Sequence, residues 1–352
     1  MKNITVIDLG TNKIAALTAK LSKDGTVSIE AMESLNSRGM RAGEIKDINR
    51  TVEDISLVVK RLERHKKRKI KSAFITTKSP DIEFVLSRGM VPLSNASREI
   101  TKKDIGKCLQ IAGMMKIPLE RAVLQKLVKG FRIDDGSLFP GNPEGLYGVK
   151  LETEAFIVTA KQSNINNIAK CMDHAGLLLD GIFISSIALA DCVLEDREKE
   201  KGVLLLDIGD SLTEGLIFKN SLLVYFFNVK KGADFLLDRE EEVNKGNLSV
   251  FLDEINKNVQ EVTEKFEHLV IAGGGALIDG LLEEAEKKLI CPARIGIAKD
   301  AGRSLNSQDG IIHASTIGLA ERIAKDYKAS QPYRNPVSSA IHKALHIYEM
   351  YF

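Results

Sequence analysis

Two stretches of the chain share one pattern: ITVIDLG at residues 4–10 and VLLLDIG at residues 203–209. Each is a run of aliphatic and β-branched residues that predicts a buried strand, and each ends in an Asp–aliphatic–Gly turn before a second apolar run. The two aspartates, Asp8 and Asp207, stand 199 residues apart. We therefore expect two similarly built halves, each opening with an acidic hairpin.

These turns suit a phosphate ligand. A carboxylate at the end of a buried strand can hold a hydrated Mg²⁺, and the glycine after it lets the backbone approach a phosphate. A third element, Gly273-Gly274-Gly275, stands between a strand expected at 268–272 and a helix expected at 276–289, where glycine backbone and a helix N-terminus can meet an anion or a ribose. One isolated Asp-x-Gly turn is usually only a hairpin, so the order of all three elements is what indicates a nucleotide site.

Strands and helices alternate along the rest of the chain, which predicts an α/β architecture. The apolar spacing indicates helices near 50–65, 101–113, 163–176, 186–195 and 248–266. Strands are expected at 72–77, 82–93 and 150–159, with a hairpin turn at 23–25 and a charged linker at 195–201.

Composition excludes several classes of protein. The 352 residues are 44% apolar and 28% charged, as in globular proteins, which rules out a disordered or low-complexity chain. A net charge of +2 gives no general attraction to nucleic acid, and we interpret the basic run at 64–69 as a solvated helix end. The four cysteines are scattered without metal-site spacing, and no signal peptide or spanning segment is evident, so we expect a cytosolic protein.

Two acidic turns followed by a glycine triplet form the phosphate-1, phosphate-2 and adenosine pattern of actin, Hsp70 and the sugar kinases. Further segments narrow the likeness, and the chain resembles the FtsA family of bacterial cell-division proteins. The resembling segments cover nearly the whole chain and lie at 37–39, 43–47, 87–92, 152–160, 167–177, 202–209, 273–277 and 335–336.

The resemblance implies an actin-like bilobal α/β fold with an inserted SHS2-type subdomain at 84–160. Lobe 1 would comprise 1–83 and 161–183. Lobe 2 would span 184–330, with its subdomain 2B reduced around 232–267, and 331–352 would be a linker and an amphipathic helix. The implied function is to link the FtsZ ring to the cytoplasmic membrane at the division site and to self-assemble into filaments, with ATP and Mg²⁺ between the lobes. Such a protein is at most a slow ATPase, and no residue is assigned to catalysis.

The family's motifs assign the nucleotide-binding residues by position. The first phosphate loop would consist of Asp8, Gly10, Thr11, Asn12 and Lys13. Asp207, Gly209 and Thr213 would form the second loop, and Gly273, Gly274, Gly275 and Ala276 would meet the nucleoside. Asp8 and Asp207 would hold the metal ion.

The chain departs from the family's pattern at two places. Asp210, Ser211 and Leu212 stand where relatives have Gly-Gly-Thr, and Asp210 either faces the phosphates and repels them or turns toward water. His268 follows Gly232 by only 36 positions, so much of subdomain 2B is missing, which should weaken adenosine binding and the FtsZ contact. In addition, the helix after Ile184 offers no acid or glutamine to orient a water. Members of the family vary at this position, so the absence argues only against fast hydrolysis.

The C-terminal segment has an amphipathic pattern. At helical spacing, one side gathers the apolar residues, and those expected to enter a membrane are Val337, Ile341, Ala344, Leu345, Tyr348 and Phe352. Seventeen helical residues extend about 25 Å, too short to cross a bilayer but suited to lying in the headgroup plane. Because Glu349 offsets Lys343, attachment would depend on apolar burial, with avidity supplied by self-assembly. The alternative is a helix docked on the chain's own core or on a partner.

Two other functions stay open at this point. One is a nucleotide-free actin-fold scaffold, such as a pilus-assembly relative, which would normally lack this tail. The other is a small-molecule kinase, against which the SHS2-type insert and the tail argue.

Overall fold

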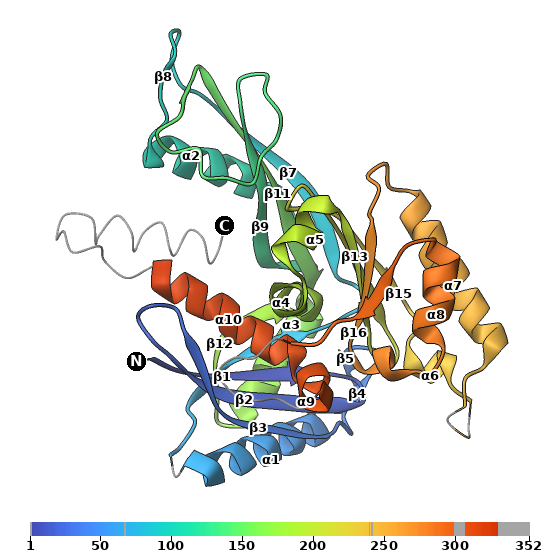
Figure 1. The fold of residues 1–352 in the computed structure, drawn as a ribbon. Helices are drawn as coiled ribbons and strands as arrows, with labels where there is room; N and C mark the ends of the chain where they lie inside the picture. The colour runs from blue at the N-terminus through green and yellow to red at the C-terminus, as the bar shows by residue number, and fades with distance from the viewer. Residues whose placement is uncertain (1, 67, 239, 241, 299–306, 330–352) are drawn as a thin grey trace.

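The computed structural model describes residues 2–66, 68–238, 240, 242–298 and 307–329, which form two lobes and an insert (Figure 1). The predicted tail at 331–352, with all six residues expected to bind membrane, lies outside the described residues. In the part of the chain that is described, no helix combines the length and the apolar character needed to span a membrane.

Lobe 1 is built on a five-stranded sheet in the order β12-β6-β1-β2-β3. Its strands are β1 (Lys2–Leu9), β2 (Lys13–Leu21), β3 (Val27–Asn36), β6 (Ser72–Thr77) and β12 (Leu178–Ile184). The first three are antiparallel neighbours, and β6 and β12 join in parallel on the other side of β1. Helices α1 (Ile48–Lys66) and α3 (Gln162–His174) bury apolar side chains against one face, among them Ile55, Leu62 and Ile168.

Lobe 2 repeats this topology in the order β15-β14-β13-β16-β17. Its strands are β13 (Val203–Ile208), β14 (Thr213–Lys219), β15 (Leu222–Val229), β16 (His268–Ala272) and β17 (Ala293–Ile295). Again the first three are antiparallel and the last two parallel, and α7 (Lys245–Gln260) and α8 (Leu281–Leu289) cover the outer face. The prediction of two similarly built halves is confirmed.

Helices α4 (Ser185–Val193) and α10 (Ala314–Ala329) pack between the two sheets and share one apolar core with both lobes (Figure 1). Strand β13 shows why its sequence is an unbroken apolar run. Val203 and Leu205 face this shared core, whereas Leu204 and Leu206 face the core under α7 and α8. A strand covered on both faces needs apolar residues at every position.

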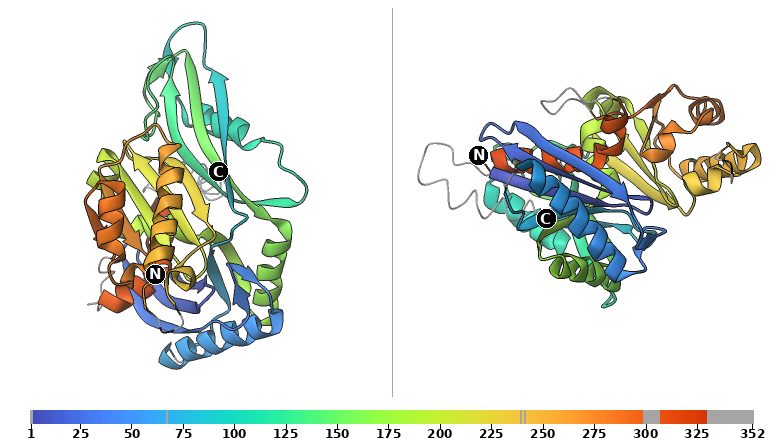
Figure 2. Two further views of the ribbon diagram at one scale, coloured as in Figure 1. Left: turned by 90° about the vertical axis from the view of Figure 1, so that its right-hand side faces the viewer. Right: turned by 90° about the horizontal axis from the view of Figure 1, so that it is seen from below.

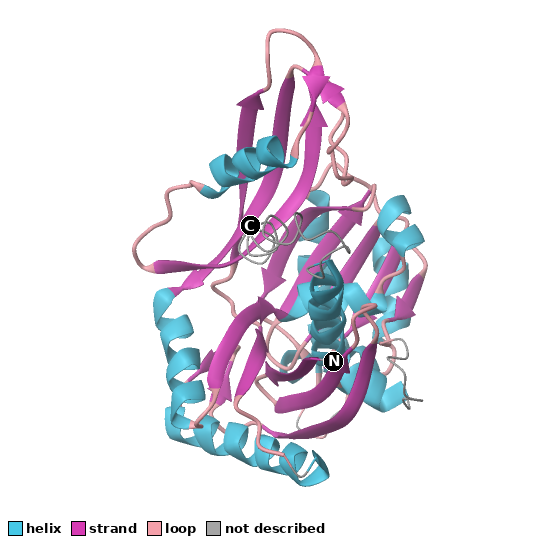
Figure 3. Cartoon of the chain, turned by 90° about the vertical axis from the view of Figure 1, so that its left-hand side faces the viewer, coloured by secondary structure: helices cyan, strands magenta, loops and turns pink. Residues whose placement is uncertain are grey.

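The insert between β6 and α3 is a sheet of its own, in the order β7-β11-β9. Its elements are β7 (Glu83–Pro92), α2 (Lys102–Gly113), β9 (Arg121–Ile133) and β11 (Lys150–Lys161). Figure 2 shows the insert standing out from the lobes, and Figure 3 shows α2 lying across the sheet. Its small core joins Val91, Ile105, Cys108 and Leu151, and all four cysteines of the chain are free and buried.

Short elements complete the described chain: β4 (Met40–Arg41), β5 (Glu44–Ile45), β8 (Arg98–Glu99), β10 (Tyr147–Gly148), α5 (Asp196–Lys201), α6 (Ala233–Leu236), the 3₁₀ helix η1 (Gly274–Leu277) and α9 (Ser307–Ile312). The sequence patterns missed the strands β9, β12, β15 and β17. The interpretation of 195–201 as a linker was wrong because this segment contains the helix α5. Two bulges in the pairing of β9 with β11 disturb the alternation that would have indicated a strand.

The predicted helix at 276–289 was also wrong in its first part. One turn of 3₁₀ helix follows the glycines, and α8 begins only at Leu281 because Gly280 takes a left-handed conformation, with φ of +73°. Helix α7 ends at Gln260 rather than at 266.

Candidate functional site

The two acidic turns and the glycine triplet converge on one cavity of about 700 Å³ between the lobes. The predicted residues that line it are Asp8, Gly10, Thr11, Asn12, Lys13, Asp207, Gly209, Gly273, Gly274 and Gly275. They meet there because β1 and β13 hold equivalent places in two sheets of the same topology, and the turns that follow both strands line the cavity.

The turns after β1 and β13 have the same geometry. The backbone N–H of Gly10 donates to the carbonyl of Lys13 at 3.0 Å, and that of Gly209 donates to the carbonyl of Leu212 at 3.0 Å. A Cβ at Gly10 would stand 2.6 Å from the Lys13 oxygen, and one at Gly209 would stand 2.9 Å from the Leu212 oxygen. Both turns are therefore too tight for any residue with a side chain.

The glycine triplet lies against the second of these turns. Gly273 has φ of +81°, and a Cβ there would stand 2.6 Å from Oδ1 of Asp207. Around a Cβ at Gly274, in contrast, no atom lies within 4 Å, so this backbone is open to the cavity. The expectation that a long helix starts directly at the triplet is not met, and its N-terminus is that of η1.

Lys78 also lines the cavity, although no sequence motif singled it out. It directly follows β6, and Thr76 pairs with Asp8 in the parallel ladder of β1 and β6. In lobe 2, Asp207 pairs with Ala272 in the same way, so Lys78 is the counterpart of Gly274. This internal symmetry is the signal that could have identified it.

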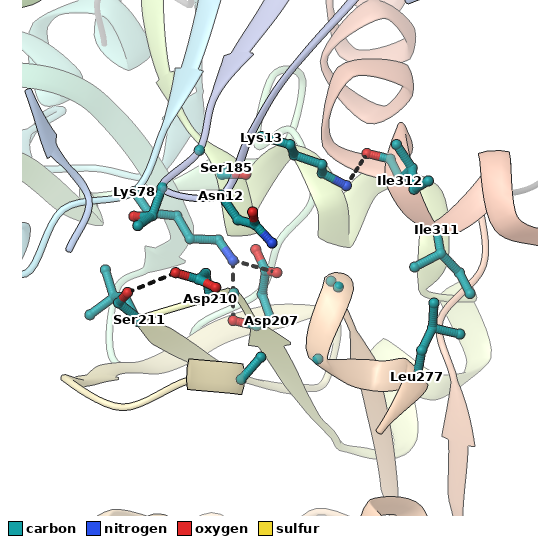
Figure 4. A pocket seen from close by; sticks show the side chains of 18 of the residues that line it. Asn12, Lys13, Lys78, Ser185, Asp207, Asp210, Ser211, Leu277, Ile311 and Ile312 are labelled. Atoms are coloured by element: carbon teal, nitrogen blue, oxygen red, sulfur yellow. Dashed lines mark hydrogen bonds and ion pairs between the residues drawn. The ribbon is translucent and has the colours of Figure 1, made fainter. Parts of the chain in front are cut away.

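The Lys78 side chain reaches from lobe 1 to Asp207 of lobe 2 (Figure 4). Its Nζ lies 2.6 Å from Oδ1 of Asp207 and donates to the backbone carbonyl of the same residue at 3.2 Å. The side chains are 17% and 4% exposed. A charge-assisted hydrogen bond with so little access for solvent is a strong one, and it joins the two lobes directly.

Unlike Lys78 and Asp207, which pair with each other, the side chains of Asp8 and Lys13 form hydrogen bonds with other neighbours. Oδ1 of Asp8 accepts from Oγ1 of Thr76 at 2.7 Å and from Oγ of Ser185 at 3.4 Å. Burial raises the pKa of Asp8, while Thr76 and the nearby ammonium groups oppose that rise. Nζ of Lys13 donates to the carbonyl of Ile312 at 2.9 Å, and burial lowers the pKa of this lysine.

Asp210 lies in the cavity wall, together with Ser211 and Leu212. Its carboxylate accepts a hydrogen bond from Oγ of Ser211 at 3.0 Å. Burial raises its pKa, and the charge of Asp234 adds to this rise. The sequence left open whether Asp210 faces the phosphates or turns toward water. Its place in the cavity wall favours the first interpretation, in which a bound ligand would contact the carboxyl group.

Part of the cavity lining is apolar. It consists of Leu237, Val243, Leu277, Ile278 and Ile311. The first two come from the shortened segment between Gly232 and His268, where they form an isolated β-bridge before α7. This shortened segment therefore still contributes side chains to the apolar lining of the cavity.

Two predicted binding residues do not line the cavity. Thr213 is fully buried, and its hydroxyl donates to the carbonyl of Lys231 at 2.9 Å. Ala276 packs into the core of lobe 2 under α8 because η1 turns it inward. Within the described ranges, no three His, Cys, Asp or Glu side chains gather as a metal site. Since Asp207 is already paired with an ammonium group, the metal-binding roles of Asp8 and Asp207 stay predictions.

The family model for the SHS2 domain inserted in FtsA matches residues 80–159. The cell division protein FtsA of Borreliella burgdorferi is 25% identical over an alignment that covers 84% of this chain and 85% of that protein. The one from Pseudomonas aeruginosa is 33% identical over 62% of this chain and 51% of that protein. This chain is an FtsA-family protein. In several alignments, including those with the Neisseria meningitidis and Pseudomonas aeruginosa proteins, it spans about half the relative's length.

Solved structures agree in fold with this FtsA-family chain. A PilM-PilN type IV pilus biogenesis complex matches with a TM-score of 0.67 and 15% identity, over 91% of this chain and 98% of that one. The ethanolamine utilization protein EutJ of Carboxydothermus hydrogenoformans matches with a TM-score of 0.54 and 11% identity, over 91% and 90%. The predicted actin-like α/β fold with an SHS2 insert is confirmed.

Proposed function

We propose that this FtsA-family chain is a cell-division protein that attaches the FtsZ ring to the cytoplasmic face of the membrane at the division site and self-assembles with ATP between its lobes. The observation that carries the proposal is the SHS2 domain inserted between β6 and α3 of an actin-like lobe, within a chain similar to relatives named cell division protein FtsA.

The shape of the cavity supports the nucleotide. The two glycine turns and the open backbone at Gly274 let a phosphate approach the main chain closely, and Lys13 and Lys78 add positive charge. The apolar part of the lining, with Leu277 and Ile278, suits an aromatic base. At the position after β12, Ser185 and Ser186 supply hydroxyl groups rather than a carboxylate or an amide that could orient water, so we expect slow hydrolysis at most.

The amphipathic sequence pattern of the C-terminal segment supports the membrane attachment. The experiment is co-pelleting of the full chain with vesicles of phosphatidylethanolamine and phosphatidylglycerol. We expect the wild type to pellet and the double variant Ile341→Glu with Leu345→Glu to stay in solution, because two charges on the apolar side oppose burial. The matched control is Ser339→Glu with His342→Glu on the polar side, which should still pellet. Equal pelleting of both variants contradicts the proposed anchor.

The FtsZ contact is tested in the same assay by adding FtsZ. We expect the wild type to carry FtsZ to the vesicles and the apolar-side variant to leave it in solution. Since the segment between Gly232 and His268 is short, we expect weak recruitment that rises with the concentration of this chain. Pelleting of this chain without FtsZ at any concentration would favour the scaffold alternative.

A further inference from the structure

The carboxylate of Asp207 is already paired with a cation in the cavity, the ammonium group of Lys78. Lys78 contributes an ammonium group that lies 2.6 Å from Oδ1 of the carboxylate and also donates to the Asp207 carbonyl at 3.2 Å. Behind the carboxylate, Gly273 packs so closely that a Cβ would stand 2.6 Å from the same Oδ1. This oxygen is therefore enclosed between a lysine and backbone, which leaves little room for a hydrated divalent ion.

The site is built to receive this lysine. Lys78 directly follows β6, a central strand of lobe 1, and its side chain is 17% exposed. The place where a Cβ of Gly209 would stand is 3.4 Å from Nζ and 4.0 Å from Cδ of Lys78, so the glycine of the second turn makes space for the lysine stem. The ion pair is thus a built-in part of the cavity lining.

The lysine retains a donor for a ligand. An ammonium group has three N–H donors, and the two contacts with Asp207 use two of them. Since Lys78 lines the cavity, the third donor can reach a phosphate oxygen. Lys13 lines the same cavity, so two ammonium groups stand where a polyphosphate would lie.

We propose that Lys78 takes the place of a divalent metal ion at Asp207, so that this cleft binds the polyphosphate of a nucleotide without metal. The inference rests on the proposed binding of ATP between the lobes. It explains why, within the described ranges, no cluster of three metal-ligating side chains accompanies the two acidic turns.

The test is isothermal titration calorimetry of the full chain with ATP, once in EDTA and once in excess MgCl₂. We expect the wild-type Kd to differ by less than about threefold between the two buffers, because a lysine already neutralises Asp207. In Lys78→Met, metal-free binding should weaken by about tenfold or more, and Mg²⁺ should recover it, because the metal can then approach the unpaired carboxylate. In the double variant Lys78→Met with Asp207→Asn, Mg²⁺ should no longer help.

Two further variants control for folding and for general charge. Lys71→Met makes the same change at the opposite, exposed end of β6 and should leave both Kd values unchanged. Lys78→Arg keeps the cation and should retain metal-free binding, which keeps the proposal testable if Lys78→Met does not fold.

The outcomes separate this inference from the proposed function. Wild-type binding that requires Mg²⁺ overturns the replacement of metal by Lys78 and leaves the ATP proposal standing. An absence of ATP binding in both buffers, with the wild type folded by circular dichroism, overturns both.

Discussion

Phe84 stacks on Phe226, with their ring centroids 4.0 Å apart and their planes at 19°. Phe84 belongs to β7 of the SHS2 insert, and Phe226 belongs to β15 of lobe 2. At the same junction, Nδ2 of Asn228 donates to the carbonyl of Ile82 at 3.4 Å. The insert enters the chain within lobe 1, yet its first strand is fastened to lobe 2, so the orientation of the insert depends on both lobes.

Replacing Phe226 with alanine should loosen this junction. We expect a loss of about 2 kcal/mol in the free energy of unfolding, because the variant gives up the contact area of a half-buried ring and its stacking contact. Urea denaturation measures the loss, and limited trypsin digestion should cut the insert faster. Phe226→Leu keeps most of the apolar volume and should lie between. Unchanged cleavage of the insert in Phe226→Ala would show that this contact does not hold it.

The crossing of α4 and α10 should be intolerant of a single methyl group. A Cβ at Gly318 would stand 1.9 Å from the carbonyl oxygen of Ala188 and 3.2 Å from Sγ of Cys192. Gly318→Ala should therefore force the helices apart and destabilise the protein by about 1–3 kcal/mol or more. The matched control is Gly106→Ala in α2, where no atom lies within 4 Å. That change should be neutral or stabilise by up to about 1 kcal/mol. Equal urea midpoints for both variants would contradict the close crossing.

The features that were predictable from the sequence are those that one strand and its turn determine locally. The hairpins ending at Asp8 and Asp207 each carry their own pattern of apolar run, acid and glycine, so their similarity was visible without coordinates. Lys78 was not, because its importance depends on Asp207, which lies 129 residues away in the other lobe. Strand β9 was missed because its bulges are produced by pairing with β11, which is a property of the sheet and not of the segment.

The predicted binding residues also divide into those that the local sequence determines and those that depend on packing elsewhere. Gly10 and Gly209 were predictable because a tight turn needs glycine whatever surrounds it. Thr213 and Ala276 belong to the same motifs, yet their directions depend on how the next element packs, and both turn away from the cavity. For Asp210, the sequence left open whether its carboxyl group faces the phosphates or water. The conformation of the turn that carries Asp210 depends on the segment that starts at Gly232, which packs against it.

Glu214 should make the protein less stable as the pH rises. This carboxyl group is fully buried opposite Asp207 in the β13–β14 ladder, and burial raises its pKa to about 7, against the opposing charge of Lys78. In the unfolded chain it titrates near 4.5. Between these values the native state binds a proton that the unfolded state has lost, so the wild type should lose roughly 3 kcal/mol relative to Glu214→Gln as the pH rises from 4.5 to above 7. Urea unfolding of both proteins at several pH values measures the difference, and a constant difference would contradict a buried, protonated Glu214.

His313 should act in the opposite direction, because burial, with the charge of Lys13 adding to it, lowers the pKa of this imidazole to about 4. The unfolded chain then binds a proton that the native state rejects, so stability falls as the pH drops from 6.5 toward 4, by roughly 3 kcal/mol relative to His313→Gln. In the wild type, the two groups change the free energy of unfolding with pH in opposite directions between about pH 4.5 and 6.5, so their contributions largely cancel. Measured against the double variant in urea unfolding, Glu214→Gln alone should therefore gain stability across this interval as the pH rises, and His313→Gln alone should lose it. Parallel profiles for the two single variants would mean that at least one of these groups titrates in the native state as it does in water.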